Sequence, residues 1–325
     1  MGGHLLHIWN LPEKRLNNED FSRVSDCVVE AIKKELPECK VAPLRCFSEK
    51  DSHGDLDIEI SAANVNFFDL ILKLFGAEAH KNGPTYSFPL DGFQVDLSTC
   101  SEDSFDICLV YKDFERGMFL GRVANAIGVR FGWNGLFLRI DIADYYDAPP
   151  RIYDILVSKG PEEIFDLLGY DSNDTDKSFK NKEELFDWVV SGKYFSPEPF
   201  KLENLNHQNR IRNRKRPNYS SFIDWCSERA FPERQIPDKL VFQHKILTDW
   251  CLWGEIKKIK RNLDKATERA AKFNGNLIRE SFGLEGAALG EFIINFKKSI
   301  KNFEKFVDEN SKEEIMRELE IFYEH

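Results

Sequence analysis

The sequence predicts an α+β protein: a small mixed β-sheet with helices on one face, followed by an α-helical body. Apolar and polar residues alternate strictly at 55–60 and again at 92–98, as they do in strands with one buried face. After Pro149 and Pro150 the apolar residues recur mostly at helical spacing. We therefore expect two domains, residues 1–150 and 151–325, with the paired prolines as the boundary.

The first hundred residues are predicted to run helix, strand, strand, helix, strand, strand. Helical spacing over 18–36 stops at Pro37, and a second helix over 64–75 is closed by Gly76. Asp91-Gly92 is a strong turn dipeptide and predicts a hairpin. The four strands are expected at 40–47, 55–60, 85–90 and 93–97.

The rest of the chain is predicted to be largely helical. A helix over 119–127 and a strand over 135–142 precede the paired prolines. Later helices are expected at 161–168, 182–191, 220–229 and 238–263, with two more between 285 and 323. Residues 169–181 and 195–219 are expected to form long loops.

Composition and charge narrow the function classes. The net charge of −10 argues against general affinity for nucleic acid, but residues 201–261 carry 14 Lys/Arg and 7 Asp/Glu, so they are +7 and the remainder is −17. A basic segment on an acidic protein fits a phosphate-rich partner bound at one place. Seven cysteines without a C-x-x-C pair indicate reduced thiols and argue against a structural zinc site. No membrane span or secretory signal is evident, so we expect a cytoplasmic protein.

The segment from His53 to Ile60 contains the most informative pattern. Asp55, Asp57 and Glu59 share one face of the predicted strand, opposite three apolar side chains. Neighbouring like charges raise each other's pKa, and a divalent cation relieves the repulsion. Oxygen ligands of this kind suit Mg²⁺. Asp96, on a second alternating strand, would complete a two-metal site of the kind that performs phosphoryl transfer.

An Asp-x-Asp strand after a turn and a helix, with a third Asp on a later strand, resembles the polymerase-β-type nucleotidyltransferase superfamily. Among its members, poorly characterised viral and phage-type proteins resemble this chain in the Gly-Asp-Leu-Asp strand, in the Gln-Val-Asp strand and in segments like 119–124, 132–136 and 210–216. About twenty residues, within 274–278 and 283–290, also resemble the helical body of tRNA nucleotidyltransferases and poly(A) polymerases.

This resemblance implies that an NTP donates its nucleoside monophosphate to a hydroxyl acceptor and that pyrophosphate is released. Asp55 and Asp57 would bind two Mg²⁺ ions, or Mn²⁺ in their place, and Asp96 would be the third carboxylate. An RNA 3′ end, for example that of a tRNA, is the preferred acceptor. The residues expected at the nucleotide are Ser48, Lys50, His53, Gly54 and Arg122.

Two segments bear on how phosphates would be bound. The superfamily usually has Gly-Ser or Gly-Gly before the Asp-x-Asp strand, whereas this chain has Phe47-Ser48. Basic residues near aromatic ones can bind nucleic acid, although such runs also occur on plain solvated surfaces. The residues expected to contact nucleic acid are Arg210, Arg212, Arg214, Lys215 and Arg216.

Alternatives remain open at this stage. The same head could transfer a nucleotide to a protein or a small molecule, or could have lost its chemistry and serve as a nucleic-acid-binding or regulatory protein. Asp57 and Glu59 could instead belong to an exonuclease-type metal site. More simply, Glu59 is expected to be a solvated carboxylate on an edge strand.

Overall fold

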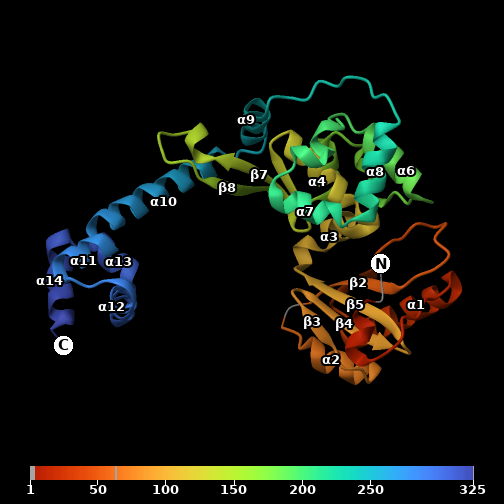
Figure 1. The fold of residues 1–325 in the computed structure, drawn as a ribbon, viewed down its shortest axis with the longest axis horizontal. Coiled ribbons are helices and arrows are strands. Elements are labelled where there is room, and N and C mark those ends of the chain that lie inside the picture. Colours follow the sequence, from red (N-terminus) through yellow and green to blue (C-terminus); the bar gives the residue numbers. More distant parts are fainter. Residues whose placement is uncertain (1–3, 63, 325) are drawn as a thin grey trace. The chain divides into compact units, whose positions relative to one another are not determined.

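The computed structural model describes residues 4–62 and 64–324, and it confirms the predicted α+β class with a helical body (Figure 1). The chain forms two compact units. The first contains residues up to Asp141 together with Ile152–Trp250, and the second contains Ile142–Arg151 together with the chain from Cys251 onwards.

A five-stranded mixed sheet lies in the first unit, with strand order β1-β2-β5-β4-β3. β2 and β5 are parallel neighbours, whereas the other pairings are antiparallel. The strands are β1 (Lys40–Pro43), β2 (Asp55–Ser61), β3 (His80–Asn82), β4 (Thr85–Leu90) and β5 (Phe93–Cys100).

Two helices, α1 (Asn18–Glu35) and α2 (Phe67–Phe75), pack on one face of this sheet (Figure 1). Their apolar residues form one core with the apolar side chains of β2 and β5. Asn17 caps α1 by accepting a hydrogen bond from the backbone N–H of Asp20, and α2 ends at Gly76, whose φ of 63° suits glycine. Because this face is filled, the charged residues of β2 are turned to the opposite face.

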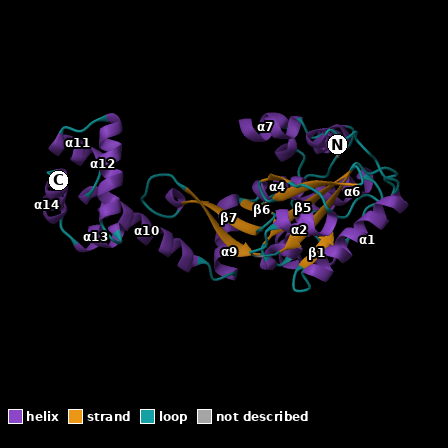
Figure 2. Cartoon of the chain, turned by 90° about the horizontal axis from the view of Figure 1, so that it is seen from below, coloured by secondary structure: helices purple, strands orange, loops and turns teal. Residues whose placement is uncertain are grey.

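The chain then builds a second, smaller sheet and a set of helices within the same unit. The sheet has the order β6-β7-β8, and β6 lies beside α4 (Figure 2). Its strands are β6 (Val129–Gly132), β7 (Gly135–Asp141) and β8 (Ile152–Ser158). The helices are α3 (Phe105–Lys112), α4 (Arg116–Ala126), α5 (Pro161–Leu168), α6 (Lys182–Ser191), α7 (His207–Arg214), α8 (Pro217–Ser227) and α9 (Lys239–Asp249). Short 3-10 helices occur at His4–Trp9, Glu102–Ser104, Asp113–Glu115, Ile142–Asp144, Ser172–Asp176, Glu198–Phe200 and Leu202–Asn204.

The second unit is helical and has its own aromatic core. Phe296 is buried there with Ile278 and Leu319, while Phe273 and Phe303 pack at its edge. The aromatic residues near the C-terminus therefore form a core of their own. The helices are α10 (Trp253–Lys272), α11 (Gly275–Phe282), α12 (Gly286–Ser299), α13 (Phe303–Glu309) and α14 (Lys312–Tyr323).

Three expectations from the sequence need correction. The paired prolines are not followed at once by helix, because β8 pairs with β7 and draws the chain on both sides of 149–150 into one sheet. The helix expected over 238–263 is two helices, interrupted where Cys251 adopts a φ of 54°. The loop expected over 195–219 contains α7, which lacks the apolar spacing that would have revealed it.

None of the described helices combines the length and the apolar character that a membrane crossing requires.

Candidate active site

Asp55 and Asp57 line an open pocket of about 710 Å³ in the first unit. This volume is in the range of small-molecule sites. The parallel pairing of β2 with β5 places Asp96 directly opposite Asp57. Three carboxylates from two neighbouring strands therefore share one face of the sheet, as the alternation predicted.

The charges of these residues act on one another. Burial by the surrounding protein, together with the charges of Asp55 and Asp96, raises the pKa of Asp57 to about 7. The Asp57 side chain is nevertheless exposed to solvent, because the pocket that it lines is open. Burial also raises the pKa of Asp96, against hydrogen bonds from Ser87 and Gln94 that favour its charged form. A donor set of carboxylates that resist ionising together fits a divalent cation with hard oxygen ligands.

Asp96 is held by a neighbour on its own strand. The side-chain amide of Gln94 donates to both Asp96 oxygens, at 3.0 and 2.9 Å. Gln94 is itself fixed, because its Oε1 accepts a hydrogen bond of 2.9 Å from the backbone N–H of Leu5. Asp96 does not line the pocket, and within the described chain the ligand atoms of the three aspartates do not all lie within 4.8 Å of one another. Gln94 fixes the orientation of the Asp96 carboxylate beside Asp57.

The pocket also contains several lysines. Lys50, Lys180 and Lys182 line it, and Lys182 begins α6, whose N-cap is Asn181. Two backbone hydrogen bonds join the segment before β2 to the segment before α6, from Ser48 N–H to Phe179 O and from Glu49 N–H to Lys180 O. Anions are favoured near lysine side chains and near the first turn of a helix. The lysines thus add local positive charge, while Glu49 and Glu183 line the same pocket and Lys180 pairs with Glu184 at 3.7 Å.

Sequence reasoning missed Lys180 and Lys182, although Asn181 before the predicted helix at 182–191 marked a helix N-terminus. Their place beside β2 depends on pairing between segments about 130 residues apart in the chain.

The five residues predicted at the nucleotide fall into different places. Lys50 and His53 line the pocket, whereas Gly54 is buried next to them and Ser48 is exposed outside the lining. Arg122, on α4, lines a separate pocket.

His53 is fixed and held neutral. Its Nε2 lies 2.8 Å from Asn18 Oδ1, and its ring stacks on Phe21 at 3.9 Å. Burial and the charges of Lys50 and Arg15 lower its pKa, so it carries no charge at neutral pH. His53 therefore shapes the wall of the pocket and does not bind phosphate as a cation.

Glu59 is neither an edge-strand carboxylate nor available to an exonuclease-type site. β2 lies between β1 and β5, and Glu59 is fully buried with its Oε2 2.5 Å from Lys112 Nζ. The expectation of a solvated carboxylate was wrong, because α3 packs over this end of the strand and supplies Lys112.

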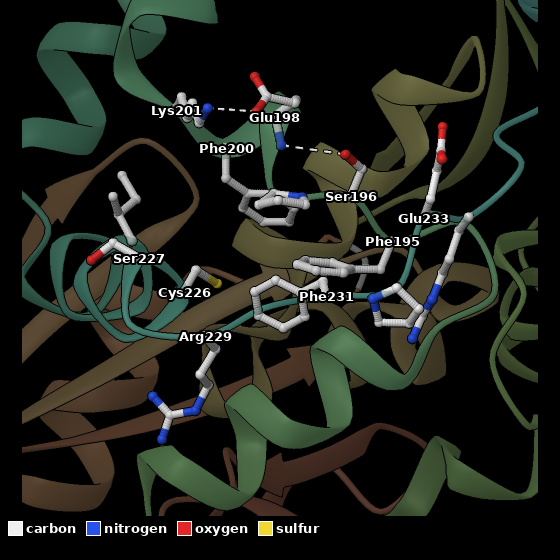
Figure 3. Close-up of a pocket in the computed structure, with 14 residues that line it drawn as sticks. Phe195, Ser196, Glu198, Phe200, Lys201, Cys226, Ser227, Arg229, Phe231 and Glu233 are labelled. Atoms are coloured by element: carbon white, nitrogen blue, oxygen red, sulfur yellow. Dashed lines mark hydrogen bonds and ion pairs between the residues drawn. The ribbon is translucent and has the colours of Figure 1, made fainter.

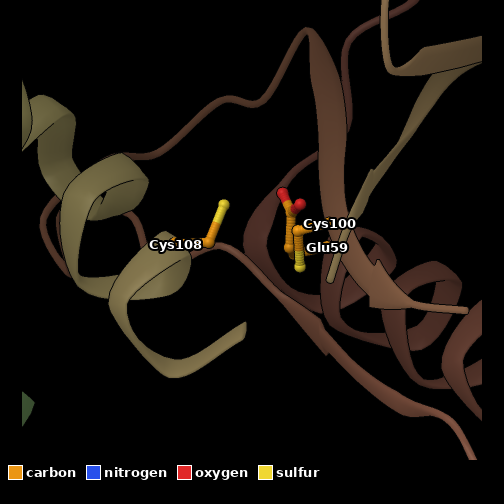
Figure 4. A group of neighbouring side chains, drawn as sticks. All are labelled: Glu59, Cys100 and Cys108. Atoms are coloured by element: carbon orange, nitrogen blue, oxygen red, sulfur yellow. The ribbon is translucent and has the colours of Figure 1, made fainter. Parts of the chain in front are cut away.

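Cys100 and Cys108 lie beside Glu59 (Figure 4), and the ligand atoms of the three residues are within 4.8 Å of one another. Such a group could hold a metal ion by distance alone. However, Lys112 already offsets the charge of Glu59, and a hydrogen bond with Cys100 and burial both raise the pKa of the Cys108 thiol. We interpret the cluster as interior packing of two thiols beside an ion pair.

A strained segment lies between α3 and α4. Phe114 and Glu115 have φ angles of 53° and 58°, a region that non-glycine residues enter at a cost of about 1–3 kcal/mol each. This conformation brings Phe114 and Glu115 into the wall of the pocket that Asp55 and Asp57 line, which we call the carboxylate pocket. Glu115 accepts a hydrogen bond of 2.6 Å from Asn218 at the start of α8.

The predicted nucleic-acid residues do not act as one group. Arg210 is structural, since its guanidinium donates to the carbonyls of Leu202 and Leu205. Arg212 and Arg216 line the same pocket as Arg122. Arg214 and Lys215 are exposed outside that pocket.

A further pocket of about 470 Å³ is lined by aromatic side chains, with Phe195, Phe200 and Phe231 converging at its centre (Figure 3). Arg229 and Glu233 lie at its edge. It contains none of the residues predicted from the sequence and lies apart from the carboxylates of β2.

Comparison with known proteins assigns no family: no protein-family model matches the chain, and no curated protein matches it significantly.

Proposed function

We propose that this protein is a metal-dependent nucleotidyltransferase that moves a nucleoside monophosphate from an NTP to the 3′-hydroxyl of an RNA and releases pyrophosphate. The main support is that Asp55 and Asp57 line the same open pocket as Lys50, Lys180 and Lys182. Carboxylates and lysines that line one pocket suit a triphosphate that arrives with divalent cations.

The residues divide the work by charge. Asp55 and Asp57 would hold Mg²⁺, and the proton that Asp57 retains near neutral pH would leave when the cation binds. Bound Mg²⁺ would neutralise the charge that develops on the phosphoryl oxygens. The lysines would orient the β- and γ-phosphates, and Asp96, positioned by Gln94, would accept the proton of the attacking hydroxyl at a carboxylate oxygen.

Incorporation of a radiolabelled nucleotide tests this proposal. Each of the four NTPs is incubated with the protein, Mg²⁺ and a short RNA, and product is separated by gel electrophoresis. We expect label on RNA with a free 3′-hydroxyl, and none on the same RNA with a 3′-deoxy end or in the presence of EDTA. Parallel reactions with a protein and with small hydroxyl compounds identify another acceptor.

Calorimetric titration with NTP, with and without Mg²⁺, separates an inactive protein from an enzyme with an untested acceptor. Mg²⁺-dependent NTP binding without transfer to RNA would favour a protein or small-molecule acceptor. The absence of both binding and transfer would overturn the proposal and favour a non-catalytic protein on this fold.

A further inference from the structure

A second pocket of about 460 Å³ in the first unit is strongly basic. It is lined from three directions by α4, by the β6–β7 hairpin and by α7, with the start of α9 at its edge. Six cationic side chains line it, and no Asp or Glu does. They are Arg122, Arg130, Arg139, Arg212, Arg216 and Lys239.

The cations differ in how far the protein itself neutralises them. Arg130 and Arg139 share Asp154, at 2.8 and 3.3 Å. In the described part of the chain, no carboxylate forms an ion pair with Arg122, Arg212, Arg216 or Lys239. Burial lowers the pKa of Arg122, and burial together with the charge of Arg212 lowers that of Arg216, as expected for cations gathered without a counterion. Such a group attracts a polyanion.

The sequence of α7 aims one face at this pocket. Asn209, Arg212 and Asn213 follow each other at spacings of three and one residues, which places them on one side of α7. Arg216, the N-cap residue of α8, lines the same pocket. Arg210 holds this orientation through its bonds to the preceding segment. Arg214 and Lys215 therefore point elsewhere, although they belong to the same run.

An exposed aromatic ring accompanies the cations. Trp133, in the turn between β6 and β7, lines the pocket and is 45% exposed. Unstacked bases pack on such rings, whereas paired bases in a duplex are not free to do so. Cations with an aromatic platform indicate a single-stranded polynucleotide more than an inorganic polyanion.

The basic pocket adjoins the carboxylate pocket. Tyr111 and Arg216 line the former, whereas their near neighbours in the chain, Lys112 and Asn218, line the latter. Asn218 and Glu115 bridge α8 to the strained turn before α4 at 2.6 Å. A single-stranded polynucleotide that lies across this bridge would connect the two pockets.

We propose that Arg122, Arg212, Arg216 and Lys239 hold the sugar-phosphate backbone of a single-stranded RNA whose 3′ end reaches the carboxylate pocket. This inference rests on the proposed nucleotidyl transfer for its direction, because the acceptor end must arrive at Asp55 and Asp57. Trp133 stacks on one of the bases. The basic pocket thus recognises the RNA acceptor, and the carboxylate pocket recognises the NTP.

Fluorescence anisotropy with a labelled RNA of about ten nucleotides tests the site without any need for catalysis. The variant Arg212→Ala/Arg216→Ala is expected to bind at least about tenfold more weakly than the natural protein. The slope of log Kd against log salt concentration should also decrease by about 1.4, the value for two lost contacts to single-strand phosphates.

Arg214→Ala/Lys215→Ala is the matched control, because it removes two positive charges from the same run. We expect this control to weaken binding by less than about threefold, as a long-range charge effect. Equal weakening by the two double variants, or no RNA binding by the natural protein, would overturn the proposal.

Two single variants provide tests that do not depend on the folding of the double variant. They also test whether the bound RNA is single-stranded. Lys239→Ala changes an exposed side chain and should weaken binding by about threefold or more. Trp133→Ala should weaken it by at least about fivefold through lost stacking. Unchanged affinity in Trp133→Ala, together with tighter binding of duplex RNA, would overturn the single-stranded assignment.

The two proposals can fail separately. Binding of RNA at these residues with no nucleotide transfer to any acceptor would refute the catalytic proposal and leave the RNA site standing. Transfer to a small hydroxyl compound with normal rates in Arg212→Ala/Arg216→Ala and no RNA binding would refute the RNA site alone.

Discussion

Asp57 and Glu59 are two residues apart on the same face of β2, yet they have opposite environments. Asp57 lies in an open pocket beside two other carboxylates, and its pKa is raised to about 7. Glu59 is completely buried, but Lys112 pairs with it at 2.5 Å. The comparison teaches that strand periodicity assigns a carboxylate to a face, while the element packed over that face decides whether it stabilises the fold or stays available for chemistry.

The largest expected effect is on catalysis at Asp57, which lies in the open pocket. Asp57→Asn removes the proposed cation ligand but keeps the size of the side chain, so turnover should fall at least about 10³-fold, equivalent to about 4 kcal/mol in the activation barrier. Steady-state nucleotide incorporation measures this change. Asp51→Asn, on an exposed residue outside the pocket, is the control and should retain activity. Full activity in Asp57→Asn would rule out its catalytic role.

The second-largest expected effect is on the stability of the fold at the buried Glu59–Lys112 pair. Lys112→Met leaves Glu59 buried without a partner and should lower the free energy of unfolding by about 3 kcal/mol at neutral pH. Urea denaturation followed by circular dichroism measures the loss. In a double-mutant cycle, Glu59→Gln/Lys112→Met should recover much of that stability. Additive losses would show that the pair does not interact as the structure indicates.

A smaller effect is expected where Gln94 positions Asp96. Gln94→Leu removes both amide donors, which favour the ionised form of Asp96, so the pKa of Asp96 should rise further. The acidic limb of the pH–rate profile should then move upward by about one pH unit. A purely structural role for Gln94 would lower the rate without shifting the profile.

The smallest effect is the pH dependence of stabilisation by Mg²⁺. Because the folded-state pKa of Asp57 lies above its ordinary value of 3.8, the native state binds an extra proton between these values. The stability of the metal-free protein should therefore fall as the pH rises through that window.

Mg²⁺ should offset this loss most at high pH. We expect the rise in Tm on adding Mg²⁺ to be about 2–4 °C greater at about pH 8 than at about pH 5.5. Differential scanning calorimetry measures the difference, which should disappear in Asp57→Asn. A larger rise at the lower pH would contradict the assignment.

The sequence by itself determined the elements that carry the carboxylates. Strict alternation in β2 and β5 could place its apolar side chains in a core in only one way, so Asp55, Asp57 and Asp96 had to face away from α1 and α2. The helix at 182–191 was equally clear, because Asn181 and the apolar spacing after it are local signals.

Only the tertiary structure decided which distant residues meet these carboxylates. Pairing between β2 and β5 sets Asp57 opposite Asp96, α3 covers Glu59 with Lys112, and contacts across about 130 residues bring Lys180 to the pocket. α7, which has no apolar stripe, brings Arg212 to the pocket that Arg122 lines, and the N-cap of α8 brings Arg216 there. Periodicity records only the face a side chain takes, whereas its partners follow from packing between segments far apart in the chain.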